Sequence, residues 1–470
     1  MGRNVGIMML ALAACGGGET SGGDPADAAP TSSEVGDVPA WPQREGDPQA
    51  GLRALLNEGY VGCGVPYTAY EQAFAPAPAS LRIASREGRN AELPYNFTSF
   101  ETKTGVEVVT PNCLQCHADT LRGEIVIGLP NSRTDYTQDI GGPAVLAGAF
   151  ITDPLEREAW EHWRDRVIAI SGYTVTRTVG VNPADNLAAV LFAHRDEETL
   201  AWSFEPLLEL PPDIVVPVDP PPWWHMRKKN AMFYTAAGRG DHARIMMTAS
   251  TLCVDTVEDA RAIDSYFPDI RAYISQLEPP PYPEAIDAEL AATGKVVFED
   301  TCAACHGTYG PGGEYPNTVV AVDEVGTDSV LALGASQFAE RFVLWFNNSF
   351  FGELAHLAPA PGYIAPPLDG IWATAPYLHN GSVPTVAALL DSSTRPTYWS
   401  RNFRDDDLDP VALGLAFTAS DLGHDDVTNA EQRKLIYDTT QLGYGNTGHT
   451  YGDLLTAEER RAVIEYLKTL

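Results

Sequence analysis

The sequence predicts a mainly helical protein built from two halves of similar plan. The pattern Cys-x-x-Cys-His occurs twice, at 113–117 and at 302–306. Near the end of each half, at 257–278 and at 455–470, apolar residues recur at helical spacing. Three consecutive prolines, Pro279-Pro280-Pro281, follow the first of these segments as a stiff stop. We therefore expect the first half to end close to residue 280.

The Cys-x-x-Cys-His spacing is the attachment signature of a c-type haem. One helical turn presents both thiols to the haem vinyl groups, and the adjacent histidine offers a neutral imidazole nitrogen to the iron. A structural zinc site would need four ligands, and a thioredoxin-like dithiol would not need the histidine. We predict two covalently bound haem c groups, whose attachment residues are Cys113, Cys116 and His117 for the first and Cys302, Cys305 and His306 for the second.

A helix before the motif and a closing helix at the far end follow the plan of a class I cytochrome c domain. Residues 285–299 have helical periodicity directly before the second motif. Thr456 and Glu459 form a capping box at the start of the last helix. We predict two tandem class I cytochrome c-type haem domains with long loop insertions, at 50–278 and at 283–470.

The first fifteen residues have the features of an export signal. Arg3 supplies a positive charge, and the apolar run that follows is too short to span a membrane. The run ends in Leu12-Ala13-Ala14-Cys15, which resembles the bacterial lipobox and implies a lipid on Cys15. An ordinary secretory signal or a mis-set start is the alternative. Residues 16–49 are rich in Gly, Ser, Ala, Pro and Asp, so we expect a flexible tether. These features predict a protein of the periplasm or cell surface, lipid-anchored to the outer membrane.

The chain is strongly acidic, with a formal net charge of −32 over 470 residues. This charge excludes nucleic-acid binding, which requires a basic surface. We favour an acidic, soluble surface as the explanation. The alternative is a docking field for a cationic electron donor, because complementary charge speeds encounter.

Seven cysteines are present, and four of them belong to the two haem motifs. Cys15 belongs to the signal, so Cys63 and Cys253 remain as a pair. Because export places them in an oxidising compartment, we predict a disulfide between them. Two buried free thiols, packing as small apolar side chains, are the alternative.

The second iron lacks a methionine ligand from its own half. Methionine is a common sixth ligand in cytochromes c, but no Met follows Met247. The histidines available after the second motif are His356, His379, His424 and His449. We prefer His449, because the sixth ligand usually arrives from a loop shortly before the closing helix, and we rank His379 second. A bis-histidine haem is usually an electron carrier of lower potential without an open site.

The first iron is less constrained by the sequence. Its sixth ligand is open among His225, His242, Met226, Met246 and Met247, and the iron could equally be five-coordinate and reactive. The three cations Arg227-Lys228-Lys229 are candidate partners for haem propionates, or else a solvated charge cluster. The preceding Trp223-Trp224 are core aromatics, or one of them lies between the haems as an electron relay.

The run 368–385 contains Ala375-Pro376-Tyr377-Leu378-His379-Asn380-Gly381-Ser382 and resembles the bacterial di-haem cytochrome c peroxidase superfamily. Arg395-Pro396 and residues 445–452 resemble its rubber-oxygenase-like branch. The resemblance is strong over 285–470 and weaker over 100–278. It implies a bis-histidine second haem, which matches His306 with His449, and a tryptophan between the haems, which we assign to Trp224. Typical peroxidases of the superfamily use a methionine that is missing here, and their distal acid-base residues have no counterpart that we can place.

These features predict peroxide reduction or dioxygen activation at the first haem, with the second passing electrons to or from small redox proteins. Two-electron chemistry suits a pair of irons joined by an aromatic side chain. A non-catalytic electron-transfer cytochrome and a rubber-oxygenase-like dioxygenase acting on an apolar substrate are the alternatives. The resemblance also implies calcium near the haem interface, as in the peroxidases, although the sequence contains no diagnostic loop for it.

Overall fold

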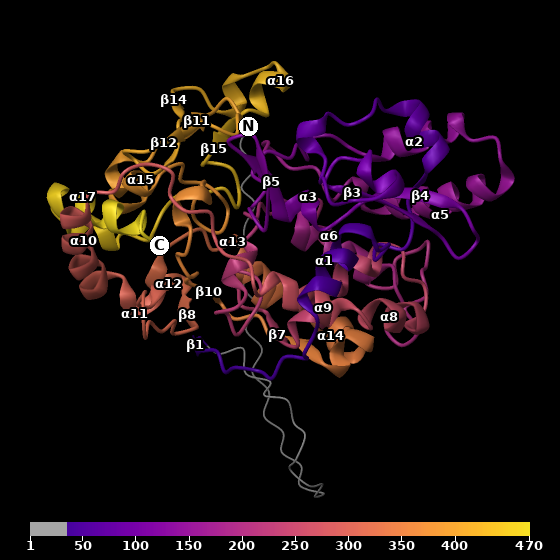
Figure 1. The fold of residues 1–470 in the computed structure, drawn as a ribbon, viewed down its shortest axis with the longest axis horizontal. Helices are drawn as coiled ribbons and strands as arrows, with labels where there is room; N and C mark the ends of the chain where they lie inside the picture. The colour runs from indigo at the N-terminus through magenta and orange to yellow at the C-terminus, as the bar shows by residue number, and fades with distance from the viewer. Residues whose placement is uncertain (1–34) are drawn as a thin grey trace, which may run out of the picture. The chain divides into compact units, whose positions relative to one another are not determined.

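A computed structural model describes residues 35–470, which fall within one compact unit (Figure 1). The predicted signal 1–15, the predicted lipidation site Cys15 and the predicted tether as far as residue 34 lie outside the described residues. The α-helices of the first half are α1 (Pro48–Asn57), α2 (Tyr67–Ala73), α3 (Leu114–His117), α4 (Gly141–Ala147), α5 (Pro154–Ser171), α6 (Ala184–Ala193), α7 (His242–Met246), α8 (Val257–Asp264) and α9 (Phe267–Ile274). Those of the second half are α10 (Ala288–Thr301), α11 (Ala303–His306), α12 (Val322–Val325), α13 (Val330–Leu333), α14 (Glu340–Asn348), α15 (Val386–Leu390), α16 (Ala430–Arg433) and α17 (Ala457–Leu467).

Short strands pair into small sheets between these helices. The three-stranded sheets, each in spatial order, are β1 (Gly36–Asp37), β8 (Thr318–Ala321) and β10 (Gly362–Ile364); β14 (Thr418–Ser420), β11 (Tyr398–Ser400) and β15 (Ile436–Asp438); and β2 (Val65–Pro66), β4 (Glu107–Pro111) and β3 (Phe97–Glu101). The two-stranded sheets are β5 (Ala118–Leu121) with β6 (Glu124–Ile127), β7 (Gly238–Gly240) with β9 (Ala355–Leu357), and β12 (Leu408–Asp409) with β13 (Gly414–Leu415).

The fold is therefore mixed, with 40% helix and 13% strand, where the sequence predicted a mainly α protein. The strands lie in the long loop insertions. These strands are only two to five residues long, which is too short to be recognised from periodicity alone. No helix in the range 35–470 is long and apolar enough to cross a bilayer.

The closing helices form as expected, with one interruption. In the second half α10 packs against α17, and Gly294 allows this contact because a Cβ there would meet the Ala462 carbonyl. The capping box of Thr456 and Glu459 is confirmed at the start of α17. In the first half the expected helix 257–278 is divided into α8 and α9. Pro268 stands in the first turn of α9, where it lacks the N–H that a continuous helix would need.

The two halves exchange segments across the predicted boundary. α14 belongs to the second half by sequence, but its Trp345 stacks on Phe192 of α6 with ring centroids 4.4 Å apart. The Trp345 indole N–H also donates to the Arg195 carbonyl at 2.7 Å. Strand β9 continues the exchange by pairing with β7 of the first half. The described chain therefore has two large hydrophobic cores within one unit, and each core takes residues from both sides of Pro279.

The predicted flexible tether does not extend to residue 49. β1 pairs with β8, and the Arg44 guanidinium donates to the carboxylates of both Asp241 and Asp264 at 2.8–3.2 Å. Asp47 caps α1. These ion pairs fix residues 44–47 to the first half. Composition alone could not reveal this, because it does not show which distant carboxylates Arg44 meets.

Candidate haem-binding sites

The second Cys-x-x-Cys-His motif forms a single helical turn at the end of α10. The Cys302 amide donates to the Phe298 carbonyl, and the His306 amide donates back to the Cys302 carbonyl at 3.0 Å. This turn, α11, places Cys302, Cys305 and His306 on the wall of a cavity of about 190 Å³. The cavity lining is largely apolar, as a porphyrin requires.

His306 is oriented by the backbone of the segment that crosses beside it. Its Nδ1 lies 2.8 Å from the Pro366 carbonyl oxygen, so Nδ1 carries the proton and donates it. Burial lowers the pKa of His306, which keeps the ring neutral. The remaining nitrogen, Nε2, is therefore the unprotonated atom that can bind a metal.

His449 faces His306 from the loop before α17. The ring centroids lie 6.1 Å apart with an interplanar angle of 61°. A metal–nitrogen bond of about 2 Å on each side leaves room for one metal between two such rings. The His449 Nδ1 is buried without a hydrogen-bond partner, and burial lowers the pKa of this side chain to about 4. These neutral, opposed rings beside two thiols fit a covalently held haem.

The loop that carries His449 is held by its backbone. Arg395 donates to the carbonyl oxygens of Asn446, Gly448 and His449 at 2.7–3.1 Å. The His449 amide donates to the Val325 carbonyl at 2.6 Å, and His449 itself adopts φ of +48°. Gly448 is required because a Cβ there would collide with the backbone of Gly326. The side chain at 449 is thus presented by a loop that does not depend on it.

His379, the second choice for the sixth ligand, lines the same cavity but does not oppose His306. Its ring stacks on Tyr363 with centroids 4.1 Å apart. Its Nε2 is buried without a hydrogen-bond partner, and burial lowers its pKa to about 3. The geometry therefore favours His449 over His379 as the partner of His306.

Side chains from the first half line part of the cavity at the second motif. The sequence did not predict that the first half contributes to the second site. These side chains are Asp219, Pro222, His225 and Tyr234. Asp219 is buried with Oδ1 unpartnered, and burial raises its pKa well above the usual value. The His225 Nε2 lies 2.9 Å from the Asp369 carbonyl oxygen. The only available signal was the proximity of Asp219 and His225 in sequence to the Trp223-Trp224 pair.

The first motif forms α3 and runs directly into β5. The hydroxyl of Tyr60 accepts from the Cys113 amide at 2.9 Å. The Cys116 sulfur lies 2.7 Å from the amide nitrogen of Asn182. His117 stacks on Trp223 with centroids 4.9 Å apart, and burial lowers its pKa to about 4, against an opposing effect of the Pro221 carbonyl. Two thiols and a neutral imidazole are again brought together.

Trp224 lies at the junction of the two sites. Its indole N–H donates to the Asp369 carbonyl at 2.7 Å, and its ring lies between Gly128 and Gly370. The Gly128 amide donates to the His117 carbonyl, while Gly370 follows the cavity residue Leu368 by two positions. The neighbouring Trp223 contacts His117 directly, a role that the sequence did not single out. The relay assigned to Trp224 stays a prediction.

Two of the three consecutive cations are paired with carboxylates. Arg227 forms an ion pair with Glu278 at the surface. The Lys228 ammonium lies 2.7 Å from the Asp369 carboxylate. Lys229 has no ion pair with any residue in the range 35–470. Of the predicted propionate partners, only Lys229 therefore keeps an uncompensated charge.

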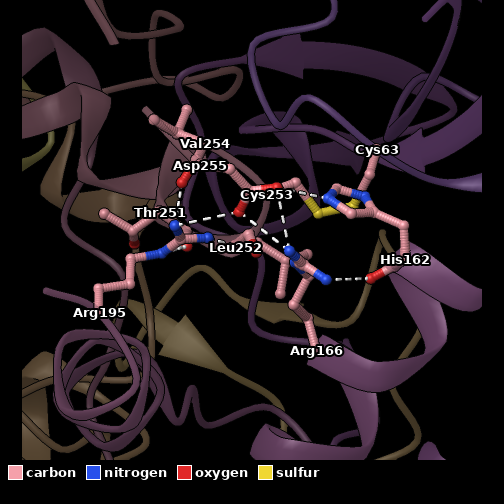
Figure 2. The surroundings of a disulfide bond; sticks show 9 residues. All are labelled: Cys63, His162, Arg166, Arg195, Thr251, Leu252, Cys253, Val254 and Asp255. Carbon is pink, nitrogen blue, oxygen red and sulfur yellow. Dashed lines mark hydrogen bonds and ion pairs between the residues drawn. A yellow bond between two sulfur atoms is a disulfide. The ribbon is translucent and has the colours of Figure 1, made fainter. Parts of the chain in front are cut away.

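Cys63 and Cys253 are joined by a disulfide. Figure 2 shows its surroundings, where the Asp255 carboxylate meets His162 Nε2 at 2.6 Å and Arg166 at 2.9 Å. Burial alone would raise the pKa of Asp255, but the bonds from His162 and Arg166 and the Arg166 charge hold this pKa below its ordinary value.

His162 lies close enough to Cys63 and Cys253 for the three side chains to bind one metal ion, and they are the group with such spacing within residues 35–470. The disulfide, however, leaves neither cysteine with a thiolate for a metal. The calcium that the family resemblance implies stays a prediction.

Acid should destabilise the fold through the buried histidines of the cavity. His379 is neutral when folded but has an ordinary pKa of about 6.5 when unfolded, so the unfolded chain binds more protons below that pH. The stability is complete above pH 6.5 and falls as the pH drops toward 3. Replacing His379→Gln should lessen the slope of the unfolding free energy against pH by about 1.4 kcal/mol per pH unit between 6 and 4.5, measured by urea titration.

The matched control is His356→Gln on β9, whose ring is only half-buried. A smaller change of slope is expected there, because desolvation of that ring is less complete. If the unfolding free energies of wild type and His379→Gln depend on pH with the same slope, His379 takes up its proton equally in the folded and the unfolded protein, which contradicts the prediction.

Comparison with known proteins places a cytochrome c-like segment at the second site. Residues 362–400 match a family model described as RoxA-like, cytochrome c-like. This segment includes Pro366, which orients His306, as well as His379 and Arg395. The match indicates a haem redox protein with haem c as its cofactor.

Two curated relatives, both from Sinorhizobium fredii (strain NBRC 101917 / NGR234), are similar over part of the chain. Uncharacterized protein y4iJ is 30% identical over 47% of this chain and 46% of its own length. Uncharacterized protein y4iM is 31% identical over 42% of this chain and 52% of its own length. The chain thus spans about half the length of the curated relatives that it matches. Within it, residues 362–400 are a RoxA-like, cytochrome c-like domain.

Proposed function

We propose that the protein is an exported di-haem c-type cytochrome with peroxidase-like redox chemistry. The observation that carries the proposal is the opposition of His306 and His449 across a cavity that also contains Cys302 and Cys305. A haem iron supplies electron transfer when both axial positions are filled, and peroxide reduction or dioxygen activation where one position is open. His306 and His449 would fill both positions of a haem held at the second site.

The first site supports a different role. The ring packed against His117 is that of Trp223, and within residues 35–470 no second histidine ring packs against it. Cys113, Cys116 and His117 are partly accessible, whereas Trp223 is buried behind them. An iron held by His117 therefore has no histidine opposite it in this arrangement. Reduction of peroxide to two waters consumes two electrons and two protons, and Trp224, packed between the two sites, provides an aromatic path for the electrons.

The remaining parts of the proposal rest on the sequence. The lipobox-like Leu12-Ala13-Ala14-Cys15 supports a lipid anchor on Cys15 and a periplasmic or cell-surface location. Small redox proteins are the proposed electron donors or acceptors. A dioxygenase acting on an apolar substrate is the second candidate, which the RoxA-like match favours.

Spectra of the purified protein in the resting, half-reduced and fully reduced states test the enzymatic proposal. Optical and electron paramagnetic resonance spectra should show one low-spin and one high-spin haem in the resting or half-reduced protein. Peroxide should change only the high-spin signal. If both haems stay low-spin in every redox state and peroxide has no effect, the protein is an electron carrier without an active site.

A further inference from the structure

Three basic side chains gather in the first half without acidic partners. They are Lys229, His242 on α7 and Arg271 on α9. Neither Lys229 nor Arg271 forms an ion pair within residues 35–470, whereas the adjacent Arg227 and Lys228 both do.

Polar atoms of two of these side chains, His242 and Arg271, are buried and unsatisfied. His242 is 2% exposed, and neither ring nitrogen has a hydrogen-bond partner of normal geometry. The Nε of Arg271 is likewise buried and unpartnered. Leaving such groups without partners costs about 1–3 kcal/mol each, and more for charged groups. A site of this kind is stable when an anion occupies it.

The nearest carboxylate is already engaged. Asp241 precedes His242, but its oxygens accept from the Arg44 guanidinium at 2.9–3.2 Å and from the Arg244 amide at 2.8 Å. Asp264 is held in the same way by Arg44 and by the Arg244 guanidinium. Asp241 acts on His242 and Arg271 through its charge, but neither acid forms an ion pair with Lys229 or Arg271. Burial lowers the pKa of Lys229 to about 8.

The group borders the hydrophobic core that also contains residues of the first haem motif. α7 packs against α9, which brings the segments of His242 and Arg271 together. Ala243 and Ile270, their respective neighbours, belong to the hydrophobic cluster against which Cys113 packs. Trp223, which stacks on His117, belongs to the same cluster. Lys229 follows Trp223 by six residues, so the three bases border the same hydrophobic core as the first motif.

We propose that Lys229, His242 and Arg271 form a binding site for the carboxylate groups of the haem held by His117. This inference rests on the proposed function, which requires a covalent haem at the first motif. The ligand chemistry is that of a carboxylate anion, and a free anion such as phosphate would offer similar acceptor oxygens. Positive charge near a haem stabilises its reduced form, so this site raises the reduction potential of the first haem.

The test compares three single variants of the full-length haem protein. Lys229→Gln and Arg271→Gln each remove one unpaired charge of the site. Arg227→Gln removes the same charge from an adjacent position where Glu278 already neutralises it, and serves as the matched control. Both test variants should lower the reduction potential of the first haem in spectroelectrochemical titration and shift its propionate bending modes in resonance Raman spectra. Arg227→Gln should leave both unchanged.

Three outcomes would overturn the assignment, and each has a different meaning. If Lys229→Gln and Arg271→Gln match Arg227→Gln in potential and Raman spectrum, the bases do not bind the propionates. If inorganic phosphate shifts the potential of the wild type and these variants abolish that shift, the site takes a free anion. The haem content of the denatured wild type is measured first, and a single covalent haem would refute the proposed function itself.

Discussion

Replacing His449→Gly is expected to convert the second haem from low spin to high spin. The opposed ring is removed, and within residues 35–470 no other histidine ring is paired with that of His306. Glycine suits the position because its φ is +48°, and the loop is held through the carbonyl oxygens that Arg395 binds. The loop should therefore keep its shape, and the change should be confined to the iron. Electron paramagnetic resonance and the Soret band measure the conversion.

Exogenous imidazole provides the positive control for this variant. Added imidazole should enter the space left by the ring and restore the low-spin spectrum, which a misfolded loop would not allow. The matched variant is His379→Ala, which removes a second buried histidine from the same cavity and should leave the second haem low-spin. A low-spin His449→Gly protein without imidazole, together with a high-spin His379→Ala protein, would assign the sixth ligand to His379 instead.

The local features of the haem sites could be predicted from the sequence because their chemistry fixes the spacing. Cys-x-x-Cys-His must span one helical turn, and the structure forms that turn as α3 and as α11. The preference for His449 followed from two facts in the sequence, namely the lack of any Met after Met247 and the position of the loop before α17. Both facts can be read from the sequence without knowing which segments pack together in the fold.

Contacts between distant segments could not be predicted in this way. Nothing in α14 shows that its Trp345 packs on Phe192, since a buried amphipathic helix has the same pattern whichever core it joins. The same applies to Arg44, which stands in a Gly- and Pro-rich segment yet binds Asp241 and Asp264. The proposed site for the haem carboxylates also depends on such contacts, because the packing of α7 on α9 brings His242 and Arg271 together.

Removing the disulfide by the double replacement of Cys63→Ala and Cys253→Ala is expected to lower the free energy of unfolding by about 2–5 kcal/mol. The two cysteines are 190 residues apart in sequence, so the disulfide closes a long loop and restricts the unfolded chain strongly. Urea unfolding at neutral pH, followed by tryptophan fluorescence, measures the loss.

The folded structure around the removed disulfide should change little, because a second set of bonds holds the same loop. Arg195 donates to the carbonyls of Thr251, Leu252 and Val254, and Arg166 binds the Asp255 carboxylate, as Figure 2 shows. The haem spectra of the double variant should therefore equal those of the wild type while its urea midpoint falls. A reductant should reproduce the fall in wild type, because it opens the disulfide but leaves the haem thioethers intact. If the wild-type midpoint is unchanged by reductant and by the double replacement, Cys63 and Cys253 exist as free thiols and the stability of the loop rests on its arginines alone.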